Sequence, residues 1–265
     1  MSNFSTNITL QAGKKIYFAS DFHLGVRNSQ KREQKICDFL EQISQDAQII
    51  FLLGDIFDFW FEYKHAIPKG FIRFQAKLVE ILDRNIPVVF FTGNHDMWLF
   101  DYFTKELGIP IFRKPIEISI NEKTFLIGHG DGLGPGDTKY KILKKIFANR
   151  LCQWLFRQIH PDWGIALAQF WSKHSRLQSE KKGAEKFLGD DEWLWIYCKE
   201  QETLKHRDFY IFGHRHLPLF LPVGENARYV NTGEWIYHHT YATFDGENVE
   251  LLAWQKAEKW QNVMI

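Results

Sequence analysis

The chain has 265 residues, of which 45% are hydrophobic and 25% charged, and its formal net charge is +1. These values are ordinary for a soluble globular protein, and the near-neutral balance excludes a bulk attraction to nucleic acid, so no nucleic-acid partner is expected. No run approaches the roughly 18 uninterrupted apolar residues of a membrane-spanning helix. The first 13 residues carry no signal-peptide core, and three widely spaced cysteines indicate reduced thiols. We expect a cytoplasmic protein with a single domain over residues 1–265.

The first half of the chain repeats a short apolar run, a polar loop and a helical pattern. Predicted strands cover residues 14–20, 49–53 and 86–91. Predicted helices cover residues 28–43 and the region around 72–82, where apolar residues recur at helical spacing. This alternation is typical of parallel βαβ units, so we expect an α/β fold.

The second half begins with a predicted hairpin at 116–127 and then loses its strand signals. Residues from 138 to about 200 read as several helices, and the stretch 139–186 is markedly basic. We interpret the region at about 134–200 as a helical cap insertion packed over the main domain. A helical layer with a solvated charged face is the alternative. Strands are expected again at 208–212, near Tyr229, at 241–244 and at 249–254.

Asp55 follows the most apolar of these runs, directly after Gly54. Glycine lets the backbone turn sharply as it leaves a sheet, so Asp55 lies where open α/β sheets place ligands, beyond a strand's carboxyl end. Its two carboxylate oxygens could bridge two cations. The alternative is that Asp55 only caps the next turn.

Four other loops carry residues of metal-binding type. The Asp-x-His and His-x-His spacings suit an extended loop, in which residues i and i+2 point the same way. Imidazole and carboxylate ligands favour Mn²⁺, Zn²⁺ or Fe²⁺. A lone histidine is more often a hydrogen-bonded core residue, but five such loops in one order favour a metal centre. The residues are Asp21 and His23; Asp55; Asn94, His95 and Asp96; His129; and His214 with His216.

The ordered set Asp-x-His, Gly-Asp, Gly-Asn-His-Asp, Gly-His and Gly-His-x-His resembles the calcineurin-like metallophosphoesterases. The resemblance implies a two-sheet β-sandwich flanked by helices, with two divalent metal ions at one end. It implies that His95 lies beside the scissile phosphate and that Asp96 orients it. It also implies one metal held by Asp21, His23, Asp55 and His216, and a second held by Asp55, Asn94, His129 and His214.

A closer resemblance is to the UDP-2,3-diacylglucosamine pyrophosphatases of lipid A biosynthesis. It is carried by Gly-Asp-Ile-Phe-Asp-Phe-Trp at 54–60 and by the basic, aromatic insertion after His-Gly-Asp. Many members have Gly-Asn-Arg-Asp where this chain has His95. The family's cap holds acyl chains, and the implied substrate contacts are Asn94, His95, Tyr140, Lys173, Ser175 and Arg176.

The function that this resemblance implies is hydrolysis of a lipid-linked nucleotide sugar to UMP and an acylated sugar 1-phosphate, with Mn²⁺ as the expected metal. One alternative is a phosphoesterase for a soluble nucleotide or phosphodiester. The other is a non-catalytic binding module of the same fold, which the intact set of ligand-type residues argues against.

Such a substrate places the protein peripherally on the cytoplasmic face of the inner membrane. We expect Lys141, Lys144 and Lys145 to attract an anionic membrane surface, and we expect no obligate protein partner. The apolar cap residues would serve the acyl chains, although ordinary helix packing is the preferred interpretation for most of them. These residues are Leu151, Trp154, Leu155, Phe170 and Trp171.

Overall fold

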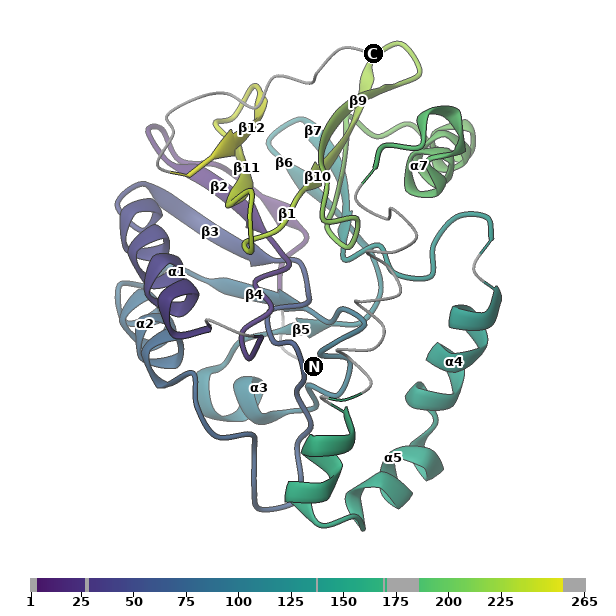
Figure 1. The fold of residues 1–265 in the computed structure, drawn as a ribbon. Helices are drawn as coiled ribbons and strands as arrows, with labels where there is room; N and C mark the ends of the chain where they lie inside the picture. The colour runs from purple at the N-terminus through teal and green to yellow at the C-terminus, as the bar shows by residue number, and fades with distance from the viewer. Residues whose placement is uncertain (1–3, 27–28, 137, 169, 171–185, 255–265) are drawn as a thin grey trace.

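The structure is a computed structural model, and it describes residues 4–26, 29–136, 138–168, 170 and 186–254. Two six-stranded sheets pack face to face, and helices cover their outer faces (Figure 1). The α/β class and the two-sheet sandwich are therefore confirmed. Among the described residues, none of the helices combines the length and the apolar content needed to cross a bilayer.

The first sheet has the strand order β12-β11-β2-β3-β4-β5. Strands β2 to β5 run parallel, as the βαβ pattern predicts, and β11 joins them antiparallel to β2. The strands are β2 (Lys15–Ala19), β3 (Ala47–Leu52), β4 (Val88–Phe91), β5 (Ile111–Phe112), β11 (Thr240–Phe244) and β12 (Val249–Ala253).

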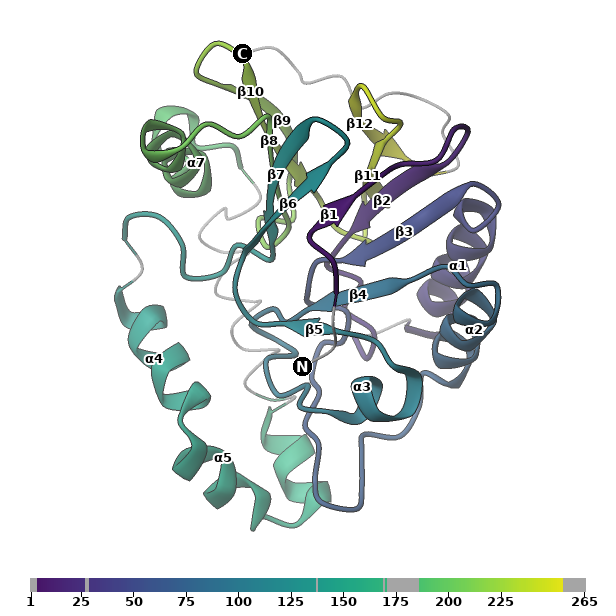
Figure 2. The ribbon, with the colours of Figure 1, turned by 180° about the vertical axis from the view of Figure 1, so that it is seen from behind.

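The second sheet has the order β1-β6-β7-β8-β10-β9 (Figure 2). The predicted hairpin is its β6–β7 pair, and β7 runs parallel to β8. The strands are β1 (Asn7–Ile8), β6 (Ile116–Ile120), β7 (Lys123–Gly128), β8 (Phe209–Phe212), β9 (Pro218–Val223) and β10 (Ala227–Thr232).

The helices fall into two outer layers and a projecting group. Helices α1 and α2 cover the first sheet, α7 covers the second, and α4 and α5 stand away from both (Figures 1 and 2). The helices are α1 (Ser29–Ile43), α2 (Ile72–Asp83), α3 (Tyr102–Leu107), α4 (Thr138–Ala148), α5 (Arg150–Arg157) and α7 (Trp193–Leu204), with a further helical stretch at 161–168 and a 3₁₀ turn, η1 (Gly189–Asp191).

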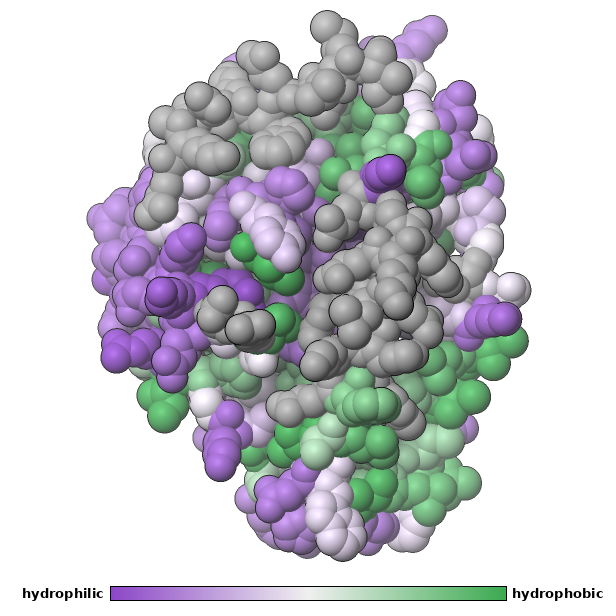
Figure 3. Space-filling model, viewed as in Figure 1, coloured by the Kyte–Doolittle hydropathy of each residue, from purple (hydrophilic) through white to green (hydrophobic). Residues whose placement is uncertain are grey.

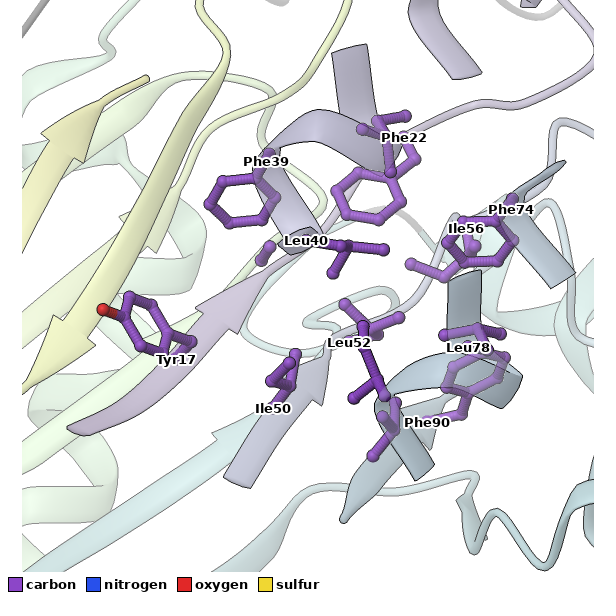
Figure 4. Packing of buried hydrophobic residues seen from close by; sticks show 14 of the residues in the cluster. Tyr17, Phe22, Phe39, Leu40, Ile50, Leu52, Ile56, Phe74, Leu78 and Phe90 are labelled. Atoms are coloured by element: carbon purple, nitrogen blue, oxygen red, sulfur yellow. The ribbon is translucent and has the colours of Figure 1, made fainter. Parts of the chain in front are cut away.

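The core has layers because neighbouring residues of a strand face opposite sides of the sheet. In β3, Phe51 packs between the two sheets, whereas Leu52 faces the helices. In β2, Phe18 and Tyr17 divide in the same way. Figure 4 shows the helix-facing layer, in which Leu52 lies between Leu40 of α1 and Leu78 of α2 and Tyr17 lies further to the left. Burial on both faces explains why these strands read as continuous apolar runs.

Three strands are absent from the sequence prediction. Strands β1 and β5 have two residues each and lie at sheet edges, too short for a periodic signal. Strand β9 contains Pro218 and Pro222, which argue against a strand on sequence alone. It forms because it is an edge strand, where a missing backbone N–H costs little.

The insertion contacts the main domain along one side only. Helices α4 and α5 bury no residue completely, but Phe147 and Phe156 pack on Trp98, and Phe156 also packs on Phe61. Asn149 separates α4 from α5, because its side chain caps the N-terminus of α5.

Leu151, Trp154, Leu155 and Phe170 are more than half exposed, so the preference for ordinary helix packing was wrong for them. Figure 3 shows hydrophobic surface at the lower right, where α4 and α5 lie in the same view of Figure 1. Trp171 lies outside the described residues.

The predicted division into one domain with an insertion at about 134–200 stays a prediction. The structure places α7, which that range only partly includes, against the second sheet. There Leu194 and Cys198 pack on Tyr210 and Tyr229. The projecting part of the insertion that the structure describes is therefore α4, α5 and the helical stretch at 161–168.

Candidate metal centre

The five predicted loops leave the carboxyl ends of parallel strands. Three follow β2, β3 and β4 of the first sheet, and two follow β7 and β8 of the second. The loops of both sheets meet, because the Asp21 carboxylate accepts the backbone N–H of His214 at 3.0 Å. The two sheets thus bring ligand-type residues from distant parts of the chain to one place.

The first cluster contains two carboxylates and two imidazoles. The Nε2 atoms of His23 and His216 are 3.0 Å apart. Asp21 Oδ1 lies 3.1 Å from His216 Nε2 and 3.8 Å from His23 Nε2. Together with a carboxylate oxygen of Asp55, these atoms lie within 4.8 Å of one another. The geometry fits four ligands around one ion.

The second cluster shares Asp55 with the first. Asp55 Oδ2 lies 3.4 Å from His129 Nε2, and the amide oxygen of Asn94 lies 3.2 Å from the same nitrogen. His214 completes the group, with its ring centroid 5.1 Å from that of His129. Asp55 therefore stands between two clusters, which is the position that a bridging ligand needs.

Two buried carboxylate oxygens support a cation at this place. Asp21 Oδ1 and Asp55 Oδ2 accept no hydrogen bond from any described residue, and both side chains are essentially inaccessible to solvent. A buried polar atom without a partner costs free energy. A divalent cation would supply that partner, and oxygen and imidazole donors are ligands that such cations accept. The residues present fit a dimetal site.

The backbone at these ligands is left-handed. Asp21, His23, Asp55, His214 and His216 all have φ between 46° and 69°. The prediction that Asp-x-His and His-x-His lie on extended loops was therefore wrong. Non-glycine residues in this region are strained, and such strain persists only where surrounding contacts hold it, as at functional sites.

Burial and the neighbouring charges of the two clusters shift the pKa values of the buried carboxylates and imidazoles. Burial opposes charge on His129, but the Asp55 carboxylate outweighs burial and raises the pKa of His129 to about 10. Burial and the neighbouring His129 lower the pKa of His214 to about 4. Although burial acts against its ionisation, Asp55 has its pKa held well below the usual value, chiefly by His129. The site therefore favours an anionic Asp55 beside a positive charge.

A family model for calcineurin-like phosphoesterases matches residues 14–218. The chain belongs to the calcineurin-like phosphoesterase family. The predicted family is thus confirmed. The phosphoesterase is a hydrolase, and its clusters of Asp and His residues can hold divalent metal ions.

Similar proteins share most of the length of this phosphoesterase. A UDP-2,3-diacylglucosamine hydrolase of Porphyromonas gingivalis is 37% identical over 262 residues, covering 92% of this chain and 99% of the relative. Another, from Actinobacillus succinogenes, is 25% identical over 222 residues, covering 83% and 92%. A solved structure of YfcE, a phosphoesterase from E. coli, has a TM-score of 0.49 at 16% identity, covering 93% and 97%.

His95 of the phosphoesterase lies beside the first cluster, with its ring 4.9 Å from that of His23. Its Nδ1 is 3.0 Å from the backbone carbonyl oxygen of Asp58 and 3.6 Å from the Asp58 carboxylate. A carbonyl oxygen only accepts hydrogen bonds, so Nδ1 carries the proton of this contact and Nε2 is the other reactive atom. Asp58 is thus the residue that orients His95.

The Asp96 carboxylate binds backbone N–H groups, whereas the resemblance implies that it orients His95. The carboxylate accepts backbone N–H groups of Gly93 at 2.7 Å and Ile56 at 2.8 Å, with a longer contact to Asp55 N. Asp96 therefore ties the loop after β3 to the loop after β4 instead of orienting the His95 ring. Burial and the Asp55 charge raise the pKa of Asp96 to about 7.

Asp58 is a functional candidate that sequence reasoning missed. It occurs in Gly-Asp-Ile-Phe-Asp, where it is a second carboxylate close after Asp55, and this spacing was the available signal. Its carboxylate also lies 3.5 Å from Nδ1 of His23, on the ring side opposite the cluster-facing Nε2. The Asp58 carboxylate thus lies within 3.6 Å of the Nδ1 atoms of two neighbouring imidazoles of the phosphoesterase.

Replacing Asp96 with alanine is expected to destabilise the phosphoesterase by about 2–6 kcal/mol, because the buried backbone N–H groups of Gly93 and Ile56 would lose their acceptor, at about 1–3 kcal/mol each. Urea denaturation followed by circular dichroism measures the change. Asp245→Ala is the matched control, since Asp245 also accepts two backbone amides, of Glu247 and Asn248, but in an exposed turn. The prediction is contradicted if Asp96→Ala lowers the free energy of unfolding no more than the control does.

The predicted substrate contacts are only partly described. Tyr140 lies at the edge of the site, with its ring 6.5 Å from that of His214 and its hydroxyl donating to Asp131 at 2.5 Å. Lys173, Ser175 and Arg176 lie outside the described residues. The assignment of these residues to substrate, like that of the metal ligands, stays a prediction.

Proposed function

We propose that the chain hydrolyses the pyrophosphate of UDP-2,3-diacylglucosamine, giving UMP and 2,3-diacylglucosamine 1-phosphate. The observation that carries the proposal is the 37% identity to the Porphyromonas gingivalis UDP-2,3-diacylglucosamine hydrolase, which extends over 99% of that relative. The solvent-exposed apolar side chains of α5 are the second support, because a polar soluble substrate gives no reason to expose them.

We assign one metal to the first cluster and one to the second, with Asp55 bridging them. Mn²⁺ is the proposed metal, because carboxylate, amide and imidazole donors without a thiolate suit it. When bound, the two cations activate the attacking water and neutralise the charge that develops on the phosphate. The proposed ligands are Asp21, His23, Asp55 and His216 for one ion, and Asp55, Asn94, His129 and His214 for the other.

The chain's own residues orient the reaction. Water attacks the phosphorus that bears uridine, the bond from this phosphorus to the bridging oxygen breaks, and the acylated sugar 1-phosphate leaves. With Nδ1–H bound to Asp58, the doubly protonated ring of His95 presents Nε2–H, which donates a hydrogen bond to the phosphate or a proton to the leaving oxygen. Asp58 holds the other nitrogen of that ring, and so keeps His95 in the orientation that donation requires.

Purified protein with Mn²⁺ is expected to prefer UDP-2,3-diacylglucosamine over UDP-N-acetylglucosamine by at least about 100-fold in kcat/KM. Burying four methylenes of an acyl chain already gives about 3 kcal/mol, and 1.36 kcal/mol corresponds to tenfold. Trp154→Ala is expected to raise KM for the diacyl substrate about 10-fold, because it removes apolar contact area. Release of UMP, followed by chromatography, measures both effects.

Two controls accompany the Trp154 variant. Tyr237→Ala removes another exposed aromatic ring, outside the insertion, and is expected to leave KM unchanged. Hydrolysis of bis(p-nitrophenyl) phosphate tests the metal centre without acyl chains and is expected to be unaffected by Trp154→Ala. Equal kcat/KM for UDP-2,3-diacylglucosamine and UDP-N-acetylglucosamine would favour the soluble-substrate alternative.

We further propose that the insertion binds an anionic membrane surface peripherally. We shift the proposed contact away from Lys141 and Lys144, because these two lysines face the chain itself. Lys141 donates to the carbonyl of Gly134, and Lys144 pairs with Asp131 at 2.7 Å. Lys145 is exposed and stays part of the proposal. Trp154 instead lines a cavity of about 520 Å³ whose other lining residues include three of basic type and no carboxylate: Tyr63, Lys64, His65, Ala66, Arg157 and Gln158.

Binding to vesicles that contain 30% phosphatidylglycerol is expected at low salt and is expected to fall with rising salt, because surface charge is screened. Lys64 lines the same cavity as Trp154, and Arg150 is the exposed first residue of α5. The double variant Lys64→Glu/Arg150→Glu is expected to bind at least about 10-fold more weakly, since each cation near the surface contributes about 1 kcal/mol. Lys14→Glu/Lys31→Glu changes the net charge equally, away from the insertion, and serves as the control. Sedimentation measures binding. Equal weakening by both double variants contradicts this surface.

A further inference from the structure

Arg215 stands between His214 and His216, yet its side chain turns away from the metal centre. The guanidinium is buried and donates to both carboxylate oxygens of Glu192, from Nε at 2.5 Å and from NH2 at 2.9 Å. Glu192 is fully buried and lies directly before α7. A bidentate pair of this kind has a defined geometry and resists rotation of either partner.

Two further contacts hold the same guanidinium. It lies over the ring of Trp193, 4.4 Å from the ring centroid, and it donates to the backbone carbonyl of Lys186 at 3.0 Å. Lys186, Glu192 and Trp193 all belong to the segment through which the insertion returns to the second sheet. Arg215 therefore connects this return segment to the loop after β8.

The loop after β8 needs such support. His214 has φ 69° and His216 has φ 54°, so both flanking residues are in the left-handed region. Such residues cost about 1–3 kcal/mol each and persist only where surrounding contacts hold them. Within the loop, Arg215 N–H donates to the Gly213 carbonyl, and Asn231 donates to the same oxygen. These bonds hold the start of the loop, whereas the Arg215 side chain holds its middle.

We propose that Arg215, through Glu192, is a positioning residue that sets His214 and His216 at once. The two histidines belong to different clusters, so one side chain fixes one ligand of each metal. This inference rests on the proposed metal ligands. Arg215 needs no contact with substrate for this role, because its guanidinium is bound to Glu192.

Removing one partner of a buried ion pair leaves an uncompensated charge, so a single variant can fail for reasons of folding alone. Replacing both partners with apolar residues avoids this problem and is often neutral for stability. The double variant Arg215→Met/Glu192→Met therefore separates folding from positioning. Arg215→Lys keeps the charge and loses the bidentate fork.

The experiment compares these two variants with the parent and with Glu117→Gln. Glu117 pairs with Arg207 at 2.9 Å in the second sheet, away from the ligand loop, so it is a matched control. Mn²⁺ affinity is measured on folded, metal-stripped protein by electron paramagnetic resonance of free Mn²⁺. Both Arg215 variants are expected to bind Mn²⁺ about 10–100-fold more weakly, as is typical when a group supporting a metal ligand is lost.

Hydrolysis of bis(p-nitrophenyl) phosphate against Mn²⁺ concentration gives the second measurement. A positioning role predicts that saturating Mn²⁺ restores most of the rate in both Arg215 variants, and that Glu117→Gln follows the parent. Parental Mn²⁺ affinity in the double variant overturns the inference, and so does a lost rate that Mn²⁺ does not restore. If the parent itself bound no Mn²⁺ or hydrolysed no phosphodiester, the proposed function would fail instead.

Discussion

Asp55→Ala is expected to remove both metal ions and to lower hydrolysis at least about 10³-fold, because the metals contribute several kcal/mol and each 1.36 kcal/mol is tenfold. Asp55 is the one carboxylate whose oxygens reach both clusters among the described residues. Without it, two cations would face one another with no shared anion between them. Loss of a ligand that serves one ion is expected to cost less.

The measurement is metal content by plasma mass spectrometry, together with the rate of bis(p-nitrophenyl) phosphate hydrolysis. Asp208→Ala is the control, since Asp208 accepts the Thr124 amide at the opposite end of β8 and touches no predicted ligand. The control is expected to keep two metals per chain. Full metal occupancy and normal turnover in Asp55→Ala would exclude the bridging role.

His95→Ala is expected to keep both metals and to lose about 10²–10⁴-fold in kcat, the usual contribution of a positioned proton donor. The ring belongs to neither proposed ligand set, although one of its nitrogens lies within 4.8 Å of ligand atoms of His23 and Asp58. Its Nδ1 is held by the Asp58 carbonyl. Its loss removes a donor to the reacting phosphate and leaves the ions in place. KM is expected to change less than kcat, because the contact strengthens in the transition state.

Metal content and steady-state kinetics of His95→Ala test this division of roles. His206→Ala is the matched control, because His206 is a solvent-exposed histidine paired with Glu202, at the far end of β8 from the metal centre. It is expected to keep parental kinetics. If His95→Ala lost metal in proportion to its rate, His95 would be a ligand.

The sequence by itself determined the α/β class, the family and the order of the ligand loops. These are local properties: apolar runs long enough for buried strands, each followed by a short polar motif. The loops that follow parallel strands lie at the same end of the sheet. Because Asp21 and Asp55 both follow predicted strands, their side chains were expected to lie close together. His129 and His214 follow strands of the second sheet, and the same rule applied to them.

Only the tertiary structure decided which groups support those loops. Asp58 orients His95, and Asp96 binds backbone amides, because of how two loops cross in space, which the spacing of their carboxylates does not specify. The pairing of Arg215 with Glu192 joins positions 23 residues apart, and charge alone does not select that partner. Which side chains meet between two packed elements depends on how both elements are placed against each other in the fold.

The insertion is a second case in which the sequence did not specify what the side chains contact. Its composition indicated helices and positive charge, yet the fold turns Lys144 toward Asp131 and leaves Trp154 in solvent. Helical periodicity says which residues share a face, but not whether that face meets the protein, a substrate or a membrane. Strand β9 forms despite two prolines for a comparable reason, since only the assembled sheet shows that it lies at an edge.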